Sequence, residues 1–297
     1  MECLKQQVPH LYRSLGGKRV AEAYEDYEGD FFENTVYCHE AAHVFGETIY
    51  AETKDITDAF AICPQACKGG CAHGAVAAMS VETPLDRLAF KYLAELCRES
   101  GRDRGDYMVC LHGLGHTMML VRDYELLDAL KDCEELKLDD VSTTPCWTGV
   151  FMENARGIGF GHDDPSAVKY LKKDDPLYPC TMRGLDQKYL WACFYQFPGT
   201  GKITAENVVP DFEACRKAPP EWEKACAEGL GMGIGSRVTR NLERIAELCR
   251  QGSELKNSCL RGALGSMTLW PKPREKMQKF CQLITPEERP VCVEFLP

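Results

Sequence analysis

The chain has 297 residues, of which 44% are hydrophobic and 27% are charged, which is the ordinary composition of a soluble globular protein. Its formal net charge is −10, from 35 basic and 45 acidic side chains, and no basic cluster is interleaved with aromatic residues, which argues against nucleic acid as a partner. No apolar stretch approaches the length needed to cross a bilayer, so we expect no membrane span.

Seventeen cysteines recur along the chain at a nearly regular spacing. A series from Cys38 to Cys292 has successive steps of 33, 39, 36, 47, 33, 33 and 33 residues, and a period in this range is the length of one helix–turn–helix unit. A second series precedes its later members by 8 to 13 residues. If the first cysteine of each pair ends one helix and the second begins the next, the two come within bonding distance across a helical hairpin. We therefore predict seven disulfides: Cys63 with Cys71, Cys97 with Cys110, Cys133 with Cys146, Cys180 with Cys193, Cys215 with Cys226, Cys249 with Cys259, and Cys281 with Cys292.

Three cysteines remain outside these pairs. We expect Cys38 to pair with Cys67 as an eighth disulfide, which leaves Cys3 free or paired with a second chain. So many cysteines in register are typical of an oxidising compartment, so we expect a secreted or periplasmic protein.

In chain order, apolar residues at three-and-four spacing indicate amphipathic helices at residues 85–96, before Cys97, and at residues 126–130, before Cys133. Strand-like alternation is scarce. Glycine recurs three residues after the second cysteine of a pair, which suggests that neighbouring helices approach closely there. These glycines are Gly74, Gly113, Gly149, Gly229 and Gly262. We predict an all-α fold, a helical-hairpin repeat array of the α/α solenoid or toroid type that is stapled by seven or eight disulfides.

The segment AELCRQGSELKNSCLRGALG, from Ala246, has a helix that ends in cysteine, a polar turn, and Cys-x-x-Gly at the start of the next helix. Over residues 55–297 this pattern resembles the cysteine-stapled relatives of tetratricopeptide repeats. The resemblance implies a right-handed superhelix with a concave face, and such scaffolds mostly bind other molecules. We expect one α/α repeat domain over residues 1–297, with a histidine-rich half at 30–165 and further stapled repeats at 166–297.

All seven histidines lie before residue 163. His39 with His43, and His112 with His116, have the i, i+4 spacing that places both rings on one helix face. His39, His73 and His112 also follow the cysteine of their repeats by one or two residues, and His43 and His116 come one turn later. Equivalent positions on successive helices project onto one surface, so we expect these five imidazoles to converge and form a metal site.

One interpretation of this site is a zinc hydrolase. The run His39-Glu40-Ala41-Ala42-His43 matches the H-E-x-x-H motif, in which two imidazoles bind zinc and the glutamate activates water. The motif continues to Gly46, but Ile49 stands where the third ligand of the longer metzincin pattern is expected. A third ligand would then come from His73, His112 or His116.

A second interpretation divides the histidines into two groups. His39, His43 and His73 form one group. His112 and His116 form the other, with either Glu153 or His162 as a further ligand; His162 lies in a glycine-rich insertion at residues 155–170. Six nitrogen-rich ligands on helices suit copper or iron, and an oxidising compartment supplies copper.

We therefore predict an extracytoplasmic metalloprotein with a copper or iron centre, acting as a metal-dependent oxidoreductase on a small-molecule or peptide substrate. Glu40 and Glu153 are the candidate catalytic residues. The candidate metal ligands are His39, His43, His73, His112, His116 and His162. Two alternatives stay open: the zinc hydrolase, and a non-enzymatic disulfide-stapled binding scaffold.

Overall fold

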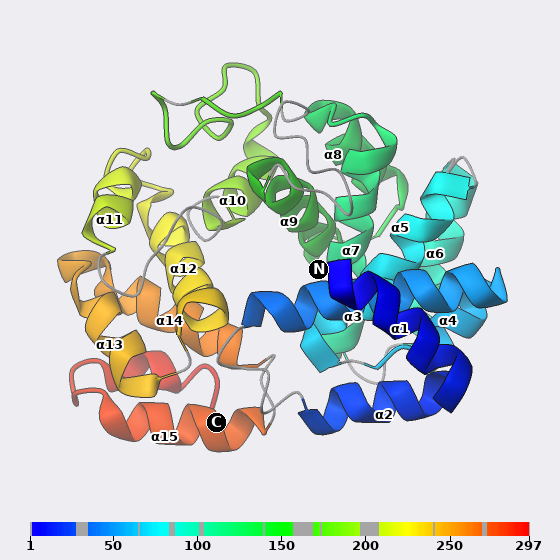
Figure 1. Cartoon of the computed structure of the whole chain (residues 1–297). Coiled ribbons are helices and arrows are strands. Elements are labelled where there is room, and N and C mark those ends of the chain that lie inside the picture. Colours follow the sequence, from blue (N-terminus) through cyan, green and yellow to red (C-terminus); the bar gives the residue numbers. More distant parts are fainter. Residues whose placement is uncertain are drawn as a thin grey trace. The chain divides into compact units, whose positions relative to one another are not determined.

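The computed structural model describes residues 2–27, 35–64, 66–82, 87–100, 104–138, 140–156, 169–172, 174–196, 208–239, 241–268 and 272–296. These residues form fifteen α-helices and no β-strand, which confirms the predicted all-α class (Figure 1). The chain divides into two compact units, residues 1–169 and 170–297.

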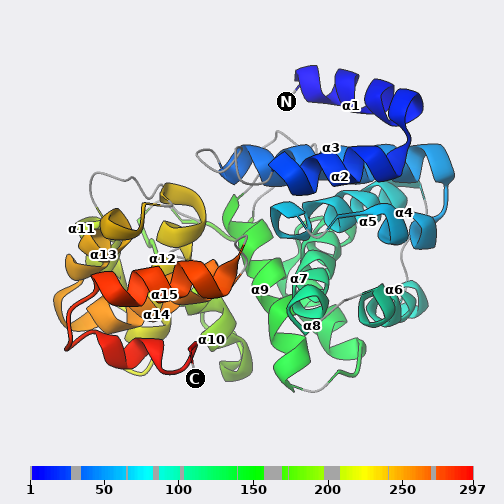
Figure 2. The same cartoon turned by 90° about the horizontal axis from the view of Figure 1, so that it is seen from below.

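Unit 1 contains nine α-helices among its described residues. They are α1 (Glu2–Leu15), α2 (Gly17–Tyr27), α3 (Thr35–Thr53), α4 (Ile56–Ile62), α5 (Gly70–Glu82), α6 (Arg87–Ser100), α7 (Arg104–Val121), α8 (Leu126–Glu135) and α9 (Asp140–Arg156), with a 3-10 helix η2 (Ala66–Gly69) before α5. Helices α7, α8 and α9 pack against one another (Figures 1 and 2).

The described part of unit 2 contains α10 (Gln187–Gln196), α11 (Val209–Cys215), α12 (Glu223–Gly233), α13 (Leu242–Arg250), α14 (Lys256–Met267) and α15 (Pro273–Leu283). A π-helical turn η5 (Ile234–Val238) follows α12, and short 3-10 helices η6 (Ser253–Leu255) and η7 (Arg289–Cys292) precede α14 and follow α15. Helix α14 packs against both α12 and α13.

Two kinds of helix alternate along the chain. Helices such as α8 are amphipathic: Leu126 and Leu130 are buried, whereas Leu127 and Lys131 are exposed. Helices such as α7 are buried over most of their length, from residue 111 to residue 119, with only His112 partly accessible. We call the second kind the central helices; they include α3, α5, α7, α9, α12 and α14. They form the core because a helix that is apolar on all sides must be covered on all sides.

The seven predicted disulfides are all present. Their Cα–Cα distances are 5.4–6.2 Å, and most join the end of an amphipathic helix to the next central helix. Cys67 is buried and disulfide-bonded, while the side chain of its expected partner, Cys38, lies outside the described residues. Cys3 is free and exposed. Closing a loop of about 15 residues is worth roughly 3 kcal/mol on the chain-entropy model, so these staples add considerable stability.

Three pairs of central helices cross in the same way: α3 with α5, α7 with α9, and α12 with α14. At each crossing a glycine of one helix faces a backbone carbonyl of the other. A Cβ atom on Gly115 would lie 2.0 Å from the oxygen of Cys146, and one on Gly149 would lie 1.9 Å from the oxygen of His112. The glycine pairs are Gly46 with Gly74, Gly115 with Gly149, and Gly231 with Gly262. The predicted close approach is therefore confirmed at Gly74, Gly149, Gly229 and Gly262, whereas Gly113 faces the ring of His73. Only glycine permits the contacts with backbone carbonyls.

The side chains around the crossing show the direction of the helices. His112 contacts Thr148, and His116, one turn later on α7, contacts Glu153, one turn later on α9. The two helices therefore run parallel, as expected when a single helix, α8, returns the chain between them. The larger array, solenoid or toroid, stays a prediction.

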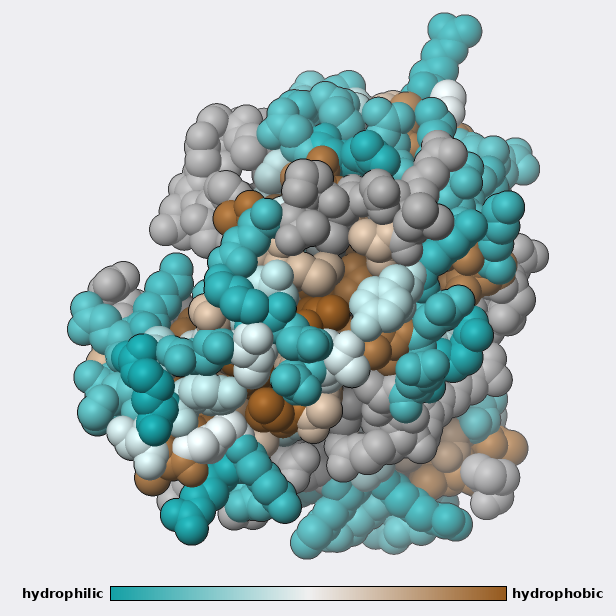
Figure 3. Space-filling view, turned by 90° about the vertical axis from the view of Figure 1, so that its right-hand side faces the viewer, coloured by the Kyte–Doolittle hydropathy of each residue, from teal (hydrophilic) through white to brown (hydrophobic). Residues whose placement is uncertain are grey.

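Hydrophilic residues dominate the face of the molecule in Figure 3, and hydrophobic residues gather in small areas between them. Within the described residues, no helix is both long enough and apolar enough to pass through a lipid bilayer.

Gly262 and Gly265 lie one turn apart on α14 and allow a matched test of the crossing. A Cβ on Gly262 would lie 1.8 Å from the oxygen of Glu228, whereas one on Gly265 would meet only the methyl carbon of Met232 at 3.5 Å. We expect Gly262→Ala to lower the free energy of unfolding by about 1–3 kcal/mol through overpacking. Gly265→Ala should raise it by up to about 1 kcal/mol, because alanine is the better helix former. Urea denaturation of both variants measures the difference, and equal effects would contradict the assigned crossing.

An ion pair between an exposed arginine and a buried glutamate joins α13 to the turn after α15. Arg250 donates to both carboxylate oxygens of Glu288, at 2.9 and 2.8 Å, and Glu288 is 1% exposed. Hydrogen bonding to Arg250 lowers the pKa of Glu288 from 4.5 to about 2. Because the folded pKa lies below the unfolded one, the stabilisation is complete above pH about 5 and is lost as the pH falls toward 2.

We expect Glu288→Gln to lower the free energy of unfolding by about 1.5–3 kcal/mol at pH 7, the range for hydrogen bonds to charged groups. The loss should shrink to less than half of this at pH 3, where the unfolded carboxyl is already protonated. Urea denaturation at both pH values checks the result. Glu294→Gln is the control, because its ion pair with Arg261 is exposed and should contribute less than about 1 kcal/mol at pH 7.

Candidate metal centre

The structure brings four of the predicted metal ligands together: His43 of α3, His73 of α5, and His112 and His116 of α7. The ring centroids are 5.6 Å apart for His43 and His73, 5.8 Å for His73 and His116, and 4.8 Å for His112 and His116. These four imidazoles therefore lie near one another, while the predicted five-histidine metal site stays a prediction. The side chains of the other candidates, His39, Glu40 and His162, lie outside the described residues.

The helix crossings correct the expected register of α3. The backbone carbonyl of His43 faces a glycine of the next central helix, as that of His112 does. His43 is thus the structural equivalent of His112, although the sequence spacing had assigned it to His116. The reason is that Cys38 lies five residues before His43, whereas Cys110 lies two residues before His112, so α3 runs almost one turn further before it reaches the crossing.

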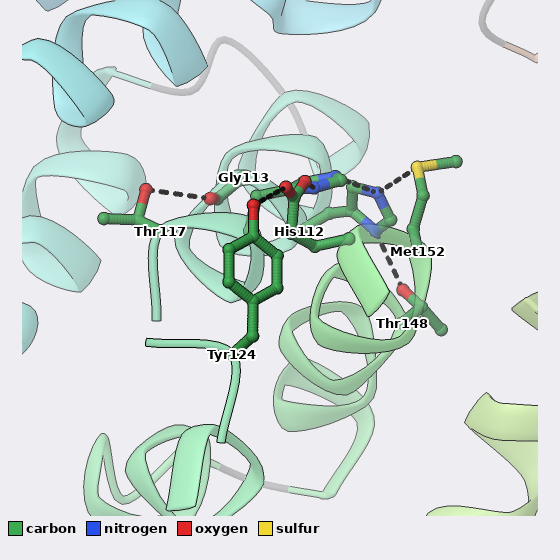
Figure 4. A network of polar contacts seen from close by, with 8 residues as sticks. His112, Gly113, Thr117, Tyr124, Thr148 and Met152 are labelled. Carbon is green, nitrogen blue, oxygen red and sulfur yellow. Dashed lines mark hydrogen bonds and ion pairs between the residues drawn. The ribbon is translucent and has the colours of Figure 1, made fainter. Parts of the chain in front are cut away.

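His112 is held by a hydroxyl group of α9. Its Nδ1 atom lies 2.9 Å from Oγ1 of Thr148, and the same hydroxyl donates to the carbonyl of Pro145 at 2.7 Å (Figure 4). A hydroxyl has a single hydrogen, so Thr148 accepts from Nδ1 of His112. The lone pair of this imidazole is therefore on Nε2.

His116 is held by a carboxylate. Its Nδ1 atom donates to Oε2 of Glu153 at 2.8 Å, and both side chains are 3% exposed. The other oxygen of Glu153 accepts from the hydroxyl of Tyr124 at 3.2 Å. A carboxylate on one imidazole nitrogen fixes the ring's tautomer, and metal-binding histidines usually have such a partner. The lone pair of His116 is therefore also on Nε2.

The two Nε2 atoms of His112 and His116 face one another at 3.1 Å. Two lone pairs at this distance repel unless a cation, either a shared proton or a metal ion, lies between them. For metal–imidazole bonds of about 2.0–2.1 Å, nitrogens so spaced subtend roughly 100° at the ion, close to the tetrahedral angle. The pair therefore has the geometry of two neighbouring ligands on one ion.

A thioether sulfur lies beside the pair. Sδ of Met152 is 3.4 Å from Nε2 of His112, and Figure 4 shows that Met152 and Thr148 approach His112 from the side opposite Tyr124. His112 and Met152 are half-buried, whereas His116 and Glu153 are buried. An ion from solvent would thus arrive on the side of His112 and Met152.

Two predicted ligands have other positions. Glu153 was expected to bind the metal or act as a base, but it lies on Nδ1 of His116, away from the facing Nε2 atoms, where it orients the ring. His73 donates from Nε2 to the carbonyl of Val109 at 3.2 Å, and its ring lies against Gly113, where a Cβ would come within 2.0 Å of Cδ2. His73 therefore turns its protonated nitrogen toward α7.

Sequence reasoning missed Thr148, Met152 and Tyr124. The first two follow Cys146 by two and six residues, the same offsets at which His112 and His116 follow their own cysteine. Alignment of the repeats in phase would have found them. Tyr124 carries no such signal, because its position depends on a turn between α7 and α8.

Two imidazoles and a thioether are donors that suit a soft transition metal. In the part of the chain that the structure describes, no three His, Cys, Asp or Glu side chains are arranged to hold a metal ion. The sulfur of Met152 is the further donor atom beside the two imidazoles. No family model, curated protein or solved structure matches the chain.

Proposed function

We propose that the protein binds a copper ion through Nε2 of His112, Nε2 of His116 and Sδ of Met152. The observation that carries the proposal is the 3.1 Å separation of the two Nε2 atoms while both Nδ1 atoms are engaged by Thr148 and Glu153. Each imidazole is preorganised to offer its lone pair to the same point.

The thioether favours copper over the other metals. Soft sulfur ligands select Cu(I), and imidazole binds copper in both oxidation states. Non-haem iron sites commonly include a carboxylate, but among the described residues Glu153, which lies beside the pair, is committed to Nδ1 of His116. Copper is therefore the ion for which this donor set is best suited.

The proposed role is redox chemistry. Three donors from two helices leave coordination positions open on the accessible side, next to His112 and Met152, and an open position is what separates a catalytic metal from a structural one. A copper ion held there would supply one-electron redox chemistry to a small molecule or peptide that reaches this side. The seven disulfides indicate an oxidising environment, and secretion to such a compartment is part of the proposal.

The zinc-hydrolase alternative depends on His39 and Glu40, whose side chains lie outside the described residues. His43, the remaining member of that motif, meets His73 edge to face. The proposal therefore uses the second histidine group, where tautomers and distances are defined. The scaffold alternative predicts no metal uptake at all.

A double substitution tests the pair without leaving Glu153 unpartnered. In His112→Asn/His116→Asn each amide nitrogen takes the place of Nδ1, so it can still donate to Thr148 or Glu153, but both Nε2 atoms are lost. We expect affinity for Cu(I) to fall more than about 100-fold, beyond the effect typical of outer-sphere partners, with a nearly unchanged thermal midpoint. Competition with a chromophoric Cu(I) chelator, under ascorbate so that the disulfides stay intact, measures the affinity. His10→Asn, at an exposed position of α1, is the control. Wild-type protein that takes up no copper would end the proposal.

Met152→Leu separates copper from zinc. Leucine has nearly the same volume but no sulfur, so Cu(I) affinity should fall roughly tenfold, or about 1.4 kcal/mol, while Zn(II) affinity stays within about twofold. Parallel titrations with both ions give the answer. Unchanged Cu(I) affinity would remove Met152 from the ligand set.

A further inference from the structure

We propose that the turn formed by residues 122–125, between α7 and α8, is a positioning element of the copper centre and acts through the hydroxyl of Tyr124. The proposal rests on the function proposed for His112 and His116. Tyr124 would touch neither the ion nor its ligands, and it would act through Glu153 alone.

The contact runs through one carboxylate. Glu153 accepts from Nδ1 of His116 with Oε2, at 2.8 Å, and from the hydroxyl of Tyr124 with Oε1, at 3.2 Å. Both oxygens are thus engaged, so rotation of the carboxylate about its terminal bond would break both hydrogen bonds. The hydroxyl therefore fixes the plane of the carboxylate, and through it the orientation of the His116 ring.

The backbone that presents Tyr124 is strained. Asp123 and Tyr124 have φ values of 49° and 59°, in the left-handed region that costs a non-glycine residue roughly 1–2 kcal/mol. Helices often end with one left-handed residue, usually glycine. Two such residues in succession, one with a bulky ring, are typical of a site where the backbone serves function.

Contacts on both sides hold this conformation. Arg122 forms a bidentate ion pair with Asp132, at 2.5 and 2.9 Å, and Asp132 is 4% exposed. Lys169 donates to the carbonyl of Asp123 at 2.8 Å and to the carboxylate of Glu125 at 2.6 Å. The turn is therefore fixed at its start and at its end, and the Tyr124 ring between them is 4% exposed.

The ring and the hydroxyl of Tyr124 have separable roles. Phenylalanine would fill the same space as the Tyr124 ring, whereas the contact with Glu153 needs the hydroxyl. Tyr124→Phe therefore tests positioning without a cavity. Tyr24→Phe is the matched control, because the hydroxyl of Tyr24 also lies in unit 1 and donates to a carbonyl, that of Ala41, at 2.8 Å.

Two measurements on these variants decide the proposal. In metal-free protein at fixed pH, the ¹⁵N and ¹H signals of the His116 imidazole report its tautomer and order. We expect them to shift or broaden in Tyr124→Phe and to stay unchanged in Tyr24→Phe. Cu(I) affinity should fall about 3- to 10-fold in Tyr124→Phe only, as expected for the loss of one hydrogen bond, with similar thermal midpoints for both variants.

A double-mutant cycle tests the route. Glu153→Gln should weaken Cu(I) binding about 10- to 100-fold, and Tyr124→Phe should add little in that background, because the two act in series. Additive effects, or unchanged His116 signals in Tyr124→Phe, would overturn the proposal. Wild-type protein that binds no copper would overturn only the proposed function, since the His116 signals decide the role of Tyr124 without metal.

Discussion

The close contact of Gly115 on α7 with Gly149 on α9 is the constraint on which the candidate centre depends. Each glycine faces a backbone carbonyl at a distance that no side chain would allow, so the helices meet backbone to backbone. Side chains on either side of the crossing then come within hydrogen-bond distance, as His112 does with Thr148 and His116 with Glu153. A helix pair at the more usual separation of 8–10 Å would leave these groups apart.

The close crossing also buries polar groups. Their burial is tolerated because they form hydrogen bonds with one another. An isolated buried carboxylate costs several kcal/mol, and Glu153 avoids this through His116 and Tyr124. The disulfide between Cys133 and Cys146 joins α8 to α9 next to this network. Covalent staples thus hold helices in place around a polar cluster that apolar packing alone would not favour.

The spacing of the cysteines predicted the main features of the fold. It predicted the seven disulfides and the all-α class, because each pair brackets a local turn whose geometry needs no long-range information. It gave α3 the wrong register relative to α7, because Cys38 lies further from the helix crossing than Cys110 does. It placed His112 and His116 on one helix face but did not show that Glu153 meets Nδ1 of His116, since only tertiary structure shows which imidazole nitrogen a carboxylate meets. The position of the Tyr124 side chain is set by a turn with left-handed backbone conformation, which no pattern in the sequence predicts.

The three crossings share one backbone arrangement but carry different side chains, so a few residues determine the chemistry that each crossing could support. At the position of His112, α3 has His43 and α12 has Glu228, and each has the same carbonyl contact with a glycine. Burial raises the pKa of Glu228, and the positive charge of Arg261 on α14 opposes the rise, so this crossing places a carboxyl group on an equivalent backbone. The scaffold therefore supplies proximity without specifying a ligand. At the α7–α9 crossing, two histidines one turn apart on the first helix meet a threonine and a methionine one turn apart on the second, and these four side chains distinguish the candidate copper site from the other two crossings.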